Sequence, residues 1–105
     1  MPPFHLTVPP SQLDVFCRRW KVSRLELFGS ALRDDFRPDS DVDILVSFAP
    51  QAAWTLLDHV EMRDELSEMV GRKVDLVSRR AVEGSQNPIR REAILGSARP
   101  LHVPG

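Results

Sequence analysis

Two aspartates stand where a buried strand is expected to begin. Asp41 and Asp43 flank Val42 at the start of the apolar run "VDILVSF". Because side chains on a strand alternate between faces, both carboxylates are expected on one face, with Cα atoms about 6.5 Å apart. Carboxylates this close raise each other's pKa and cost stability unless a cation joins them. Mg²⁺ prefers hard oxygen ligands, so the pair predicts a magnesium site.

Gly29 and Ser30 lie upstream of this pair, between a predicted strand and a predicted helical turn. Glycine lets the backbone come close to a ligand, and a helix start offers free N–H groups to phosphate. The Ser30 hydroxyl can add one hydrogen bond, and Ser40, next to Asp41, joins the expected nucleotide-binding set. Arg33 either gives the phosphate a bidentate contact or pairs with a nearby surface aspartate. A phosphate cradle beside a metal site is suited to attack on a nucleoside triphosphate.

A third aspartate, Asp75, lies between Val74 and Leu76 in the predicted strand "KVDLVS". An aspartate among apolar strand residues requires a specific role. If this strand neighbours the strand of Asp41 and Asp43, Asp75 can complete a two-metal site or accept the proton of an attacking hydroxyl. The sequence therefore predicts that Asp41, Asp43 and Asp75 converge.

The elements that would position these residues alternate between helix and strand. Apolar residues at helical spacing predict a first helix after Ser11, which is expected to cap it. A long helix is expected over 53–70, with Leu56 and Leu57 in its buried stripe and Gly71 at its end. Strands are expected over 25–28, 42–48 and 73–78, and an edge strand over 100–103. A last helix is expected over 87–95, with Gly96 past its end. This order predicts an α/β fold, a small mixed β-sheet with helices packed against it.

Length and composition limit the function classes. A chain of 105 residues is expected to form one domain, 1–105, with the proline-rich residues 1–10 extended over its surface. The net charge of −1 gives no bulk attraction to a nucleic-acid polymer, so a small nucleotide is the expected ligand. No stretch reaches the roughly 18 apolar residues of a membrane span. The single cysteine, Cys17, fits a reducing cytoplasm.

The run "FGSALRDDFRPDSDVDILV" and the later "GRKVDLVSRRAV" resemble the minimal nucleotidyltransferases of the DNA polymerase β-like superfamily. The resemblance covers the chain from about Leu25 onward. It implies a nucleotidyltransferase fold, with Mg²⁺ held at Asp41 and Asp43 and Asp75 assisting. It also implies that Gly29 and Ser30 hold the triphosphate. Asp34 departs from the family pattern, which usually has glycine there. A side chain at this position is expected either to tighten the loop or to bring negative charge near the phosphates.

Many minimal members of this family are antitoxins encoded beside a HEPN-domain ribonuclease toxin. They transfer AMP from ATP to a tyrosine hydroxyl of the toxin, so the resemblance implies the same reaction, with the toxin as partner in a hetero-oligomer. Two alternatives stay open. The chain could neutralise a toxin by binding alone, with a vestigial site, or it could modify a small molecule such as an aminoglycoside. The arginine pairs 79–80 and 90–91 are expected on solvated faces or partner contacts.

Overall fold

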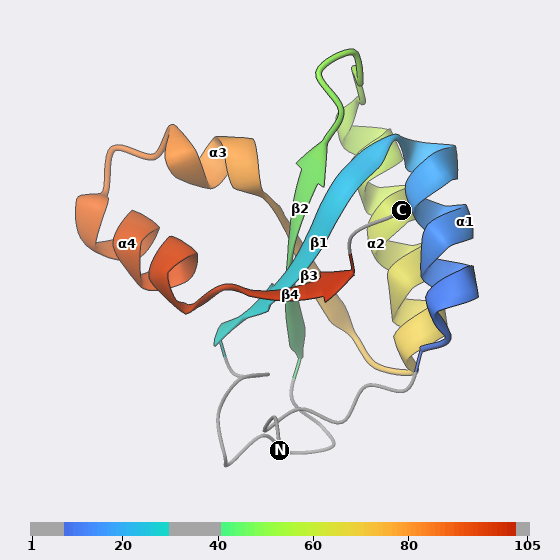
Figure 1. Ribbon diagram of the computed structural model, residues 1–105. Helices are drawn as coiled ribbons and strands as arrows, with labels where there is room; N and C mark the ends of the chain where they lie inside the picture. The colour runs from blue at the N-terminus through green and yellow to red at the C-terminus, as the bar shows by residue number, and fades with distance from the viewer. Residues whose placement is uncertain (1–7, 30–40, 103–105) are drawn as a thin grey trace.

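The computed structural model describes residues 8–29 and 41–102. Within these ranges, helices flank both faces of a four-stranded sheet, which confirms the predicted α/β class with a small mixed sheet (Figure 1). None of the helices in these ranges has the length and apolar character needed to span a lipid bilayer.

The sheet has the strand order β3-β2-β1-β4. β1 pairs antiparallel with both β2 and β4, whereas β2 and β3 run parallel. The first strand is longer than predicted, and the expected short edge strand is present. The bounds are β1 Val22–Phe28, β2 Val42–Phe48, β3 Val74–Ser78 and β4 Arg99–His102.

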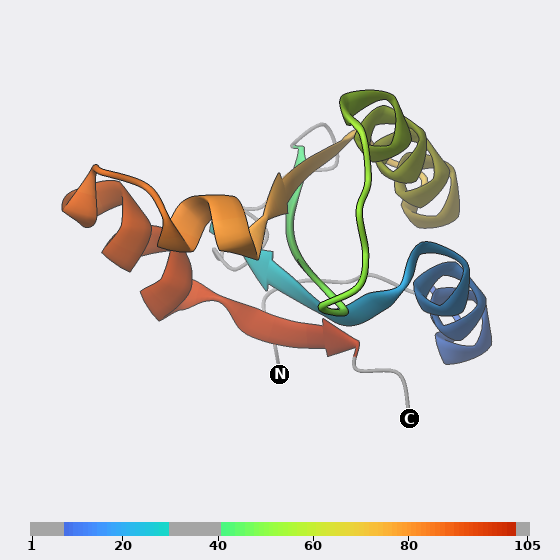
Figure 2. The same ribbon diagram turned by 90° about the horizontal axis from the view of Figure 1, so that it is seen from above.

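Helices α1 (Pro10–Trp20) and α2 (Leu56–Val70) lie side by side on one face of the sheet (Figure 2). The α1 residues that pack there recur at helical spacing, and α2 contributes Met62 and Leu66, one turn apart. From the sheet, Val42, Ile44 and Val46 enter this core, since alternate residues of β2 share a face. The α1 members of the core are Leu13, Phe16, Cys17 and Trp20.

Helices α3 (Arg79–Glu83) and α4 (Pro88–Ser97) lie on the opposite side of the sheet (Figures 1 and 2). A second, smaller apolar cluster forms beneath them, where Leu45 and Phe28 meet Val82 and Ile94. Both faces of β2 are therefore covered, as its continuous apolar run predicts. Gly96 lies inside α4 and not beyond its end, which corrects the predicted boundary.

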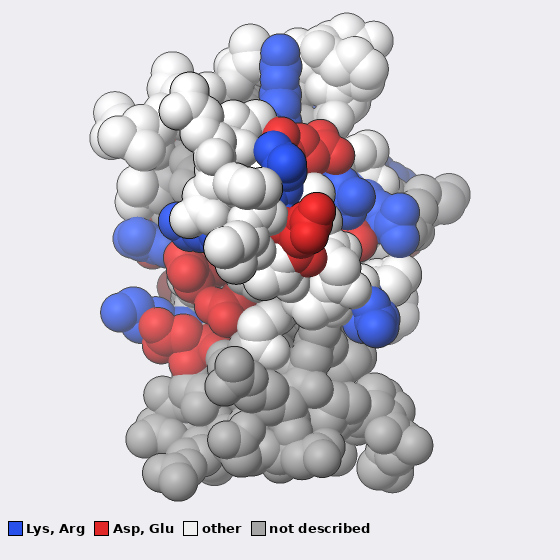
Figure 3. All heavy atoms as spheres, turned by 90° about the vertical axis from the view of Figure 1, so that its left-hand side faces the viewer, with Lys and Arg blue, Asp and Glu red and all other residues white. Residues whose placement is uncertain are grey.

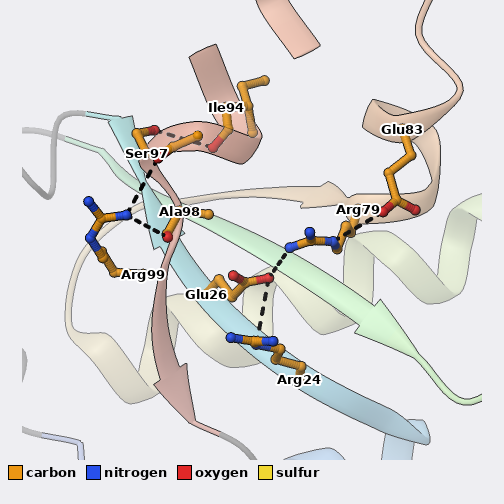
Figure 4. A network of polar contacts seen from close by, with 9 residues as sticks. Arg24, Glu26, Arg79, Glu83, Ile94, Ser97, Ala98 and Arg99 are labelled. Carbon is orange, nitrogen blue, oxygen red and sulfur yellow. Dashed lines mark hydrogen bonds and ion pairs between the residues drawn. The ribbon is translucent and has the colours of Figure 1, made fainter. Parts of the chain in front are cut away.

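A buried ion pair fastens α3 to the sheet. Glu26 of β1 is 3% exposed, and Arg79 Nη1 donates to its Oε1 at 2.6 Å (Figure 4). Burial would lower the pKa of Arg79, but the hydrogen bond and charge of Glu26, with those of Glu83, outweigh it and hold that pKa above its ordinary value. Arg79 therefore does not lie on a purely solvated face, contrary to the expectation for the arginine pairs.

The starts of the two long helices differ from the prediction. The α1 N-cap is Pro9, without a side-chain hydrogen bond, so Ser11 does not cap the helix. α2 starts after Thr55, whose side chain accepts from the Asp58 N–H while Asp58 accepts from the Thr55 N–H, a complete capping box. This box starts the helix three residues later than expected.

Leu56 and Leu57 do not join the buried stripe of α2. They are 79% and 77% exposed. At 3.6 residues per turn, they lie about 120° and 140° around the helix from Met62, which faces the core. The prediction for these two leucines was therefore wrong, whereas Gly71 ends the helix as expected, with φ +76°.

Candidate active site

Asp43 and Asp75 lie side by side on neighbouring strands. They are direct partners in the parallel register of β2 and β3, so their side chains leave the same face of the sheet. The Val42 N–H donates to the Lys73 carbonyl at 2.9 Å, which ties the starts of the two strands together. From the sequence, the meeting of Asp43 and Asp75 depended on whether their strands are neighbours. The structure shows that they are, and it brings this pair of carboxylates to one edge of the sheet.

Gly29 lies at the same edge of the sheet, at the end of β1. It directly follows β1, whose last residue, Phe28, is the antiparallel partner of Asp43. Gly29 has φ +68°, a left-handed conformation that side chains rarely adopt. A Cβ built on it would lie 3.2 Å from the Asp43 carboxyl carbon and closer still to one carboxylate oxygen. The position therefore requires glycine twice, for its backbone and for the space that the Asp43 carboxylate occupies.

The face that carries these carboxylates is the one beneath α3 and α4. Leu45 and Phe28, which share the face with Asp43, belong to the smaller apolar cluster. Further along β3, Val77 lines a cavity of about 190 Å³ with residues of α3 and α4, including Val82 and Ile94. This volume is below the roughly 300 Å³ of a typical small-molecule site, so the cavity cannot by itself enclose a nucleotide.

Charges of both signs are interspersed on this side of the molecule. Figure 3 shows Lys and Arg side chains among Asp and Glu side chains over the described residues, with several acidic groups beside the residues drawn in grey. This face of the described chain therefore offers no continuous basic surface, which agrees with the net charge of −1.

Of the other predicted site residues, the structure describes only Asp41. Asp41 is exposed and directly precedes β2. Ser30, Arg33 and Ser40 fall outside the described residues, so their assignment to nucleotide binding stays a prediction. Asp34, the departure from the family pattern, also lies outside them.

The assignment of Asp41, Asp43 and Asp75 as metal ligands stays a prediction. Across 8–29 and 41–102, no three His, Cys, Asp or Glu side chains lie close enough to hold one metal ion together. The strand register nevertheless brings Asp43 and Asp75 together, with Asp41 one residue before the strand and two before Asp43. An all-carboxylate donor set suits a hard divalent cation such as Mg²⁺. The residue types and the two adjacent carboxylates fit such an ion.

Sequence reasoning missed how Asp43 is accommodated. It assigned Gly29 a role toward phosphate, whereas the structure shows that Gly29 also makes room for a carboxylate of the site. The position of Gly29 directly after a strand indicates that a close approach occurs there. The residue that approaches it, Asp43, is 14 positions away in the sequence, and no local pattern identifies it.

Comparisons with known proteins agree with this geometry. The model of the nucleotidyltransferase domain family matches residues 10–99. The protein adenylyltransferase MntA of Thermococcus cleftensis is 35% identical over 77 residues, which cover 72% of this chain and 76% of the relative. A solved structure of a candidate minimal nucleotidyltransferase is 37% identical, with a TM-score of 0.65 and 88% of each chain covered.

A more distant structure shares the fold. It is a complex of a tri-AMPylated Shewanella oneidensis HEPN toxin with an MNT antitoxin. The matched chain is 21% identical, with a TM-score of 0.57, and the match covers 88% of this chain and 67% of that one.

Proposed function

The chain belongs to the nucleotidyltransferase domain family, and from that membership we propose that it is an antitoxin that transfers AMP from ATP to a tyrosine hydroxyl of a cognate HEPN-domain toxin. The relative named protein adenylyltransferase MntA supports AMP as the transferred group. The Shewanella complex pairs an MNT antitoxin with an AMPylated HEPN toxin, which supports a toxin as the acceptor and partner.

The observation that carries the proposal is the pairing of Asp43 with Asp75 beside Gly29. These residues come from the ends of three strands that are distant in sequence, and they meet at one edge of the sheet. Two adjacent carboxylates and a close backbone approach suit a site that handles a metal-bound phosphate.

The residues of the site divide the reaction between them. Asp41, Asp43 and Asp75 would hold divalent magnesium ions, which supply charge neutralisation at the phosphates when bound. Gly29, with Ser30, Arg33 and Ser40, would bind the triphosphate and orient its α-phosphorus toward the acceptor. Positioning of this kind supplies much of the catalysis of phosphoryl-type transfers.

Asp75 is the candidate for the proton transfer. Its exposed carboxylate can accept the proton of the attacking tyrosine hydroxyl. The tyrosine oxygen then forms a bond to the α-phosphorus, the bond from that phosphorus to the bridging oxygen breaks, and pyrophosphate leaves with the released electron pair. The products are the AMP ester of the toxin and pyrophosphate.

The test is transfer of AMP to the proposed partner, the HEPN-domain toxin that we expect to be encoded next to this chain. The two purified proteins are incubated with ATP and Mg²⁺, and the toxin is examined by mass spectrometry. We expect a mass increase of one or more AMP groups and loss of ribonuclease activity. Asp43→Asn should abolish both, while Asp64→Asn, an exposed aspartate of α2, should leave both unchanged.

Neutralisation that persists in Asp43→Asn, without any mass increase, would contradict the proposal. That result would favour an antitoxin that acts by binding alone. Modification of an aminoglycoside in place of the toxin would identify the chain as a small-molecule transferase.

A further inference from the structure

β3, the strand that carries Asp75, is an outer strand of the sheet. Within the described residues, its one strand neighbour is β2, with which it runs parallel. In a parallel ladder, successive residues turn their backbone groups alternately toward the neighbour and away from it. The Lys73 carbonyl faces β2, where it accepts from Val42. Val74 and Leu76 therefore direct backbone groups to the outer edge, one residue on each side of Asp75.

Two side chains of α2 occupy that outer edge. Ser67 Oγ accepts from the Val74 N–H at 3.1 Å, and His59 Nε2 donates to the Leu76 carbonyl at 2.8 Å. The two residues are eight positions apart, close to two turns, so they lie on the same side of α2. Ser67 is itself oriented by donation to the Arg63 carbonyl at 2.8 Å. The helix thus holds the backbone immediately before and after Asp75.

The Asp75 carboxylate depends on this backbone for its position. Among the described residues, its side chain makes no hydrogen bond or ion pair, and it is exposed. Within the described chain, its place beside Asp43 follows from the position of β3 in the sheet. β2 fixes one side of the strand, and the two α2 side chains fix the other.

We infer that His59 and Ser67 are positioning residues that hold Asp75 in register with Asp43. The catalytic consequence rests on the proposed nucleotidyl transfer, in which Asp75 acts on the acceptor and the metal. Loss of either contact frees the outer edge of β3 and widens the range of positions that the Asp75 carboxylate occupies, while Gly29, which follows β1, stays in place.

Ser97 of α4 provides a matched control for Ser67. Its hydroxyl donates to the Ala93 carbonyl at 2.8 Å, the same contact one turn back that Ser67 makes. Unlike Ser67, it accepts no hydrogen bond from a strand within the described chain. Comparison of Ser67→Ala with Ser97→Ala therefore isolates the contact with Val74.

The experiment combines amide hydrogen exchange by NMR with steady-state kinetics on the full chain. We expect Ser67→Ala and His59→Phe to speed exchange in β3 and to shift the carboxyl resonance of Asp75. In both variants kcat should fall about tenfold, with the KM for ATP changed less than about twofold. His59→Gln retains an N–H donor and should recover most of the kcat, and Ser97→Ala should match the wild type.

Exchange in β3 and an Asp75 resonance that equal those of Ser97→Ala would overturn the inference, whatever happens to activity. So would a fall in kcat that His59→Gln reproduces in full, because the donor would then be irrelevant. If the wild-type chain transfers no AMP, the proposed function fails. In that case the exchange rates and the Asp75 resonance alone test whether His59 and Ser67 position Asp75.

Discussion

Asp43 can stand at the centre of the site because the neighbouring residue, Gly29, has no side chain. A carboxylate that starts a strand needs space beside the adjacent strand end, and Gly29 provides it with a left-handed backbone. Gly71, at the end of α2, has a similar φ of +76°, but a Cβ there would meet nothing within 4 Å. A side chain at Gly71 would strain the backbone alone, whereas a side chain at Gly29 would strain the backbone and also displace the Asp43 carboxylate.

Gly29→Ala should therefore damage activity and stability together. The alanine adopts a positive φ at a cost of about 1–2 kcal/mol, and its Cβ must push the Asp43 carboxylate aside. A displacement of about 1 Å is enough to lower the rate of AMP transfer about 100-fold. Urea denaturation and the transfer assay measure the two effects.

Gly71→Ala is the control for that experiment. It should show a similar loss of stability and a near-normal transfer rate, since its Cβ meets nothing within 4 Å. Equal transfer rates in the two alanine variants would show that the contact of Gly29 with Asp43 has no role in the site.

Cys17 predicts a pH dependence of stability. Burial, and to a lesser degree the charge of Asp14, raise the pKa of its thiol from 9.0 to about 11. The unfolded thiol therefore ionises at lower pH than the folded one, so the free energy of unfolding should fall as the pH rises from about 9 to 11. Below pH 9 the thiol is protonated in both the folded and the unfolded chain, so its ionisation causes no loss of stability there.

Urea denaturation of the wild type and of Cys17→Ala at several pH values in this range measures the contribution. The chain has no tyrosine to titrate there, which simplifies the comparison. The wild type should lose stability more steeply than the variant. Parallel pH profiles would mean that the thiol ionises equally well in the folded chain.

At the scale of elements, helix starts are decided by which side chain reaches a free N–H. Thr55 and Asp58 satisfy each other's N–H groups at the start of α2. Ser11 was expected to do this for α1, but that helix begins after Pro9 without a side-chain cap. Proline in the first turn already fixes a helical φ and lacks an N–H that would need a partner.

Thr55→Ala should consequently destabilise the fold by about 1 kcal/mol, because it removes half of the capping box. Ser11→Ala, at an exposed position of α1, should change the free energy of unfolding by less than about 0.5 kcal/mol. Thermal or urea unfolding of the two variants gives the comparison. A larger loss in Ser11→Ala than in Thr55→Ala would reverse the assignment of the caps.

The strands were easier to predict from the sequence than the helices. Runs such as "VDILVSF" and "KVDLVS" combine β-branched residues with apolar character, and both form strands. Leu56 and Leu57 were placed in the core because apolar residues suggest burial, but their angular position on α2 depends on where the helix meets the sheet. The five-residue helix α3 is too short to show a helical period and was missed.

At the scale of the whole molecule, the sequence contains the aspartates but not the arrangement that joins them. The spacing of Asp41 and Asp43 implies a shared face from local geometry alone. The pairing of Asp43 with Asp75 depends on which strands become neighbours. The sequence alone does not determine that order. The ion pair of Glu26 and Arg79 joins residues 53 positions apart, and no local pattern reports such a contact.

The sheet order explains why the candidate site lies at one edge of the sheet. β1 ends where β2 and β3 begin, because β1 runs antiparallel to β2 and β2 runs parallel to β3. Gly29, Asp43 and Asp75 therefore meet from three separate segments. The same order leaves β3 outermost, where α2 can hold it.

The most direct test of this account is calorimetric titration of the full chain with a non-hydrolysable ATP analogue, with and without Mg²⁺. We predict uptake of the analogue that requires Mg²⁺, is lost in Asp43→Asn and is weakened in Asp75→Asn. Binding of equal strength without Mg²⁺, or binding unchanged in the Asp43→Asn, Asp75→Asn double variant, would contradict the claim that these two carboxylates form a metal-dependent nucleotide site.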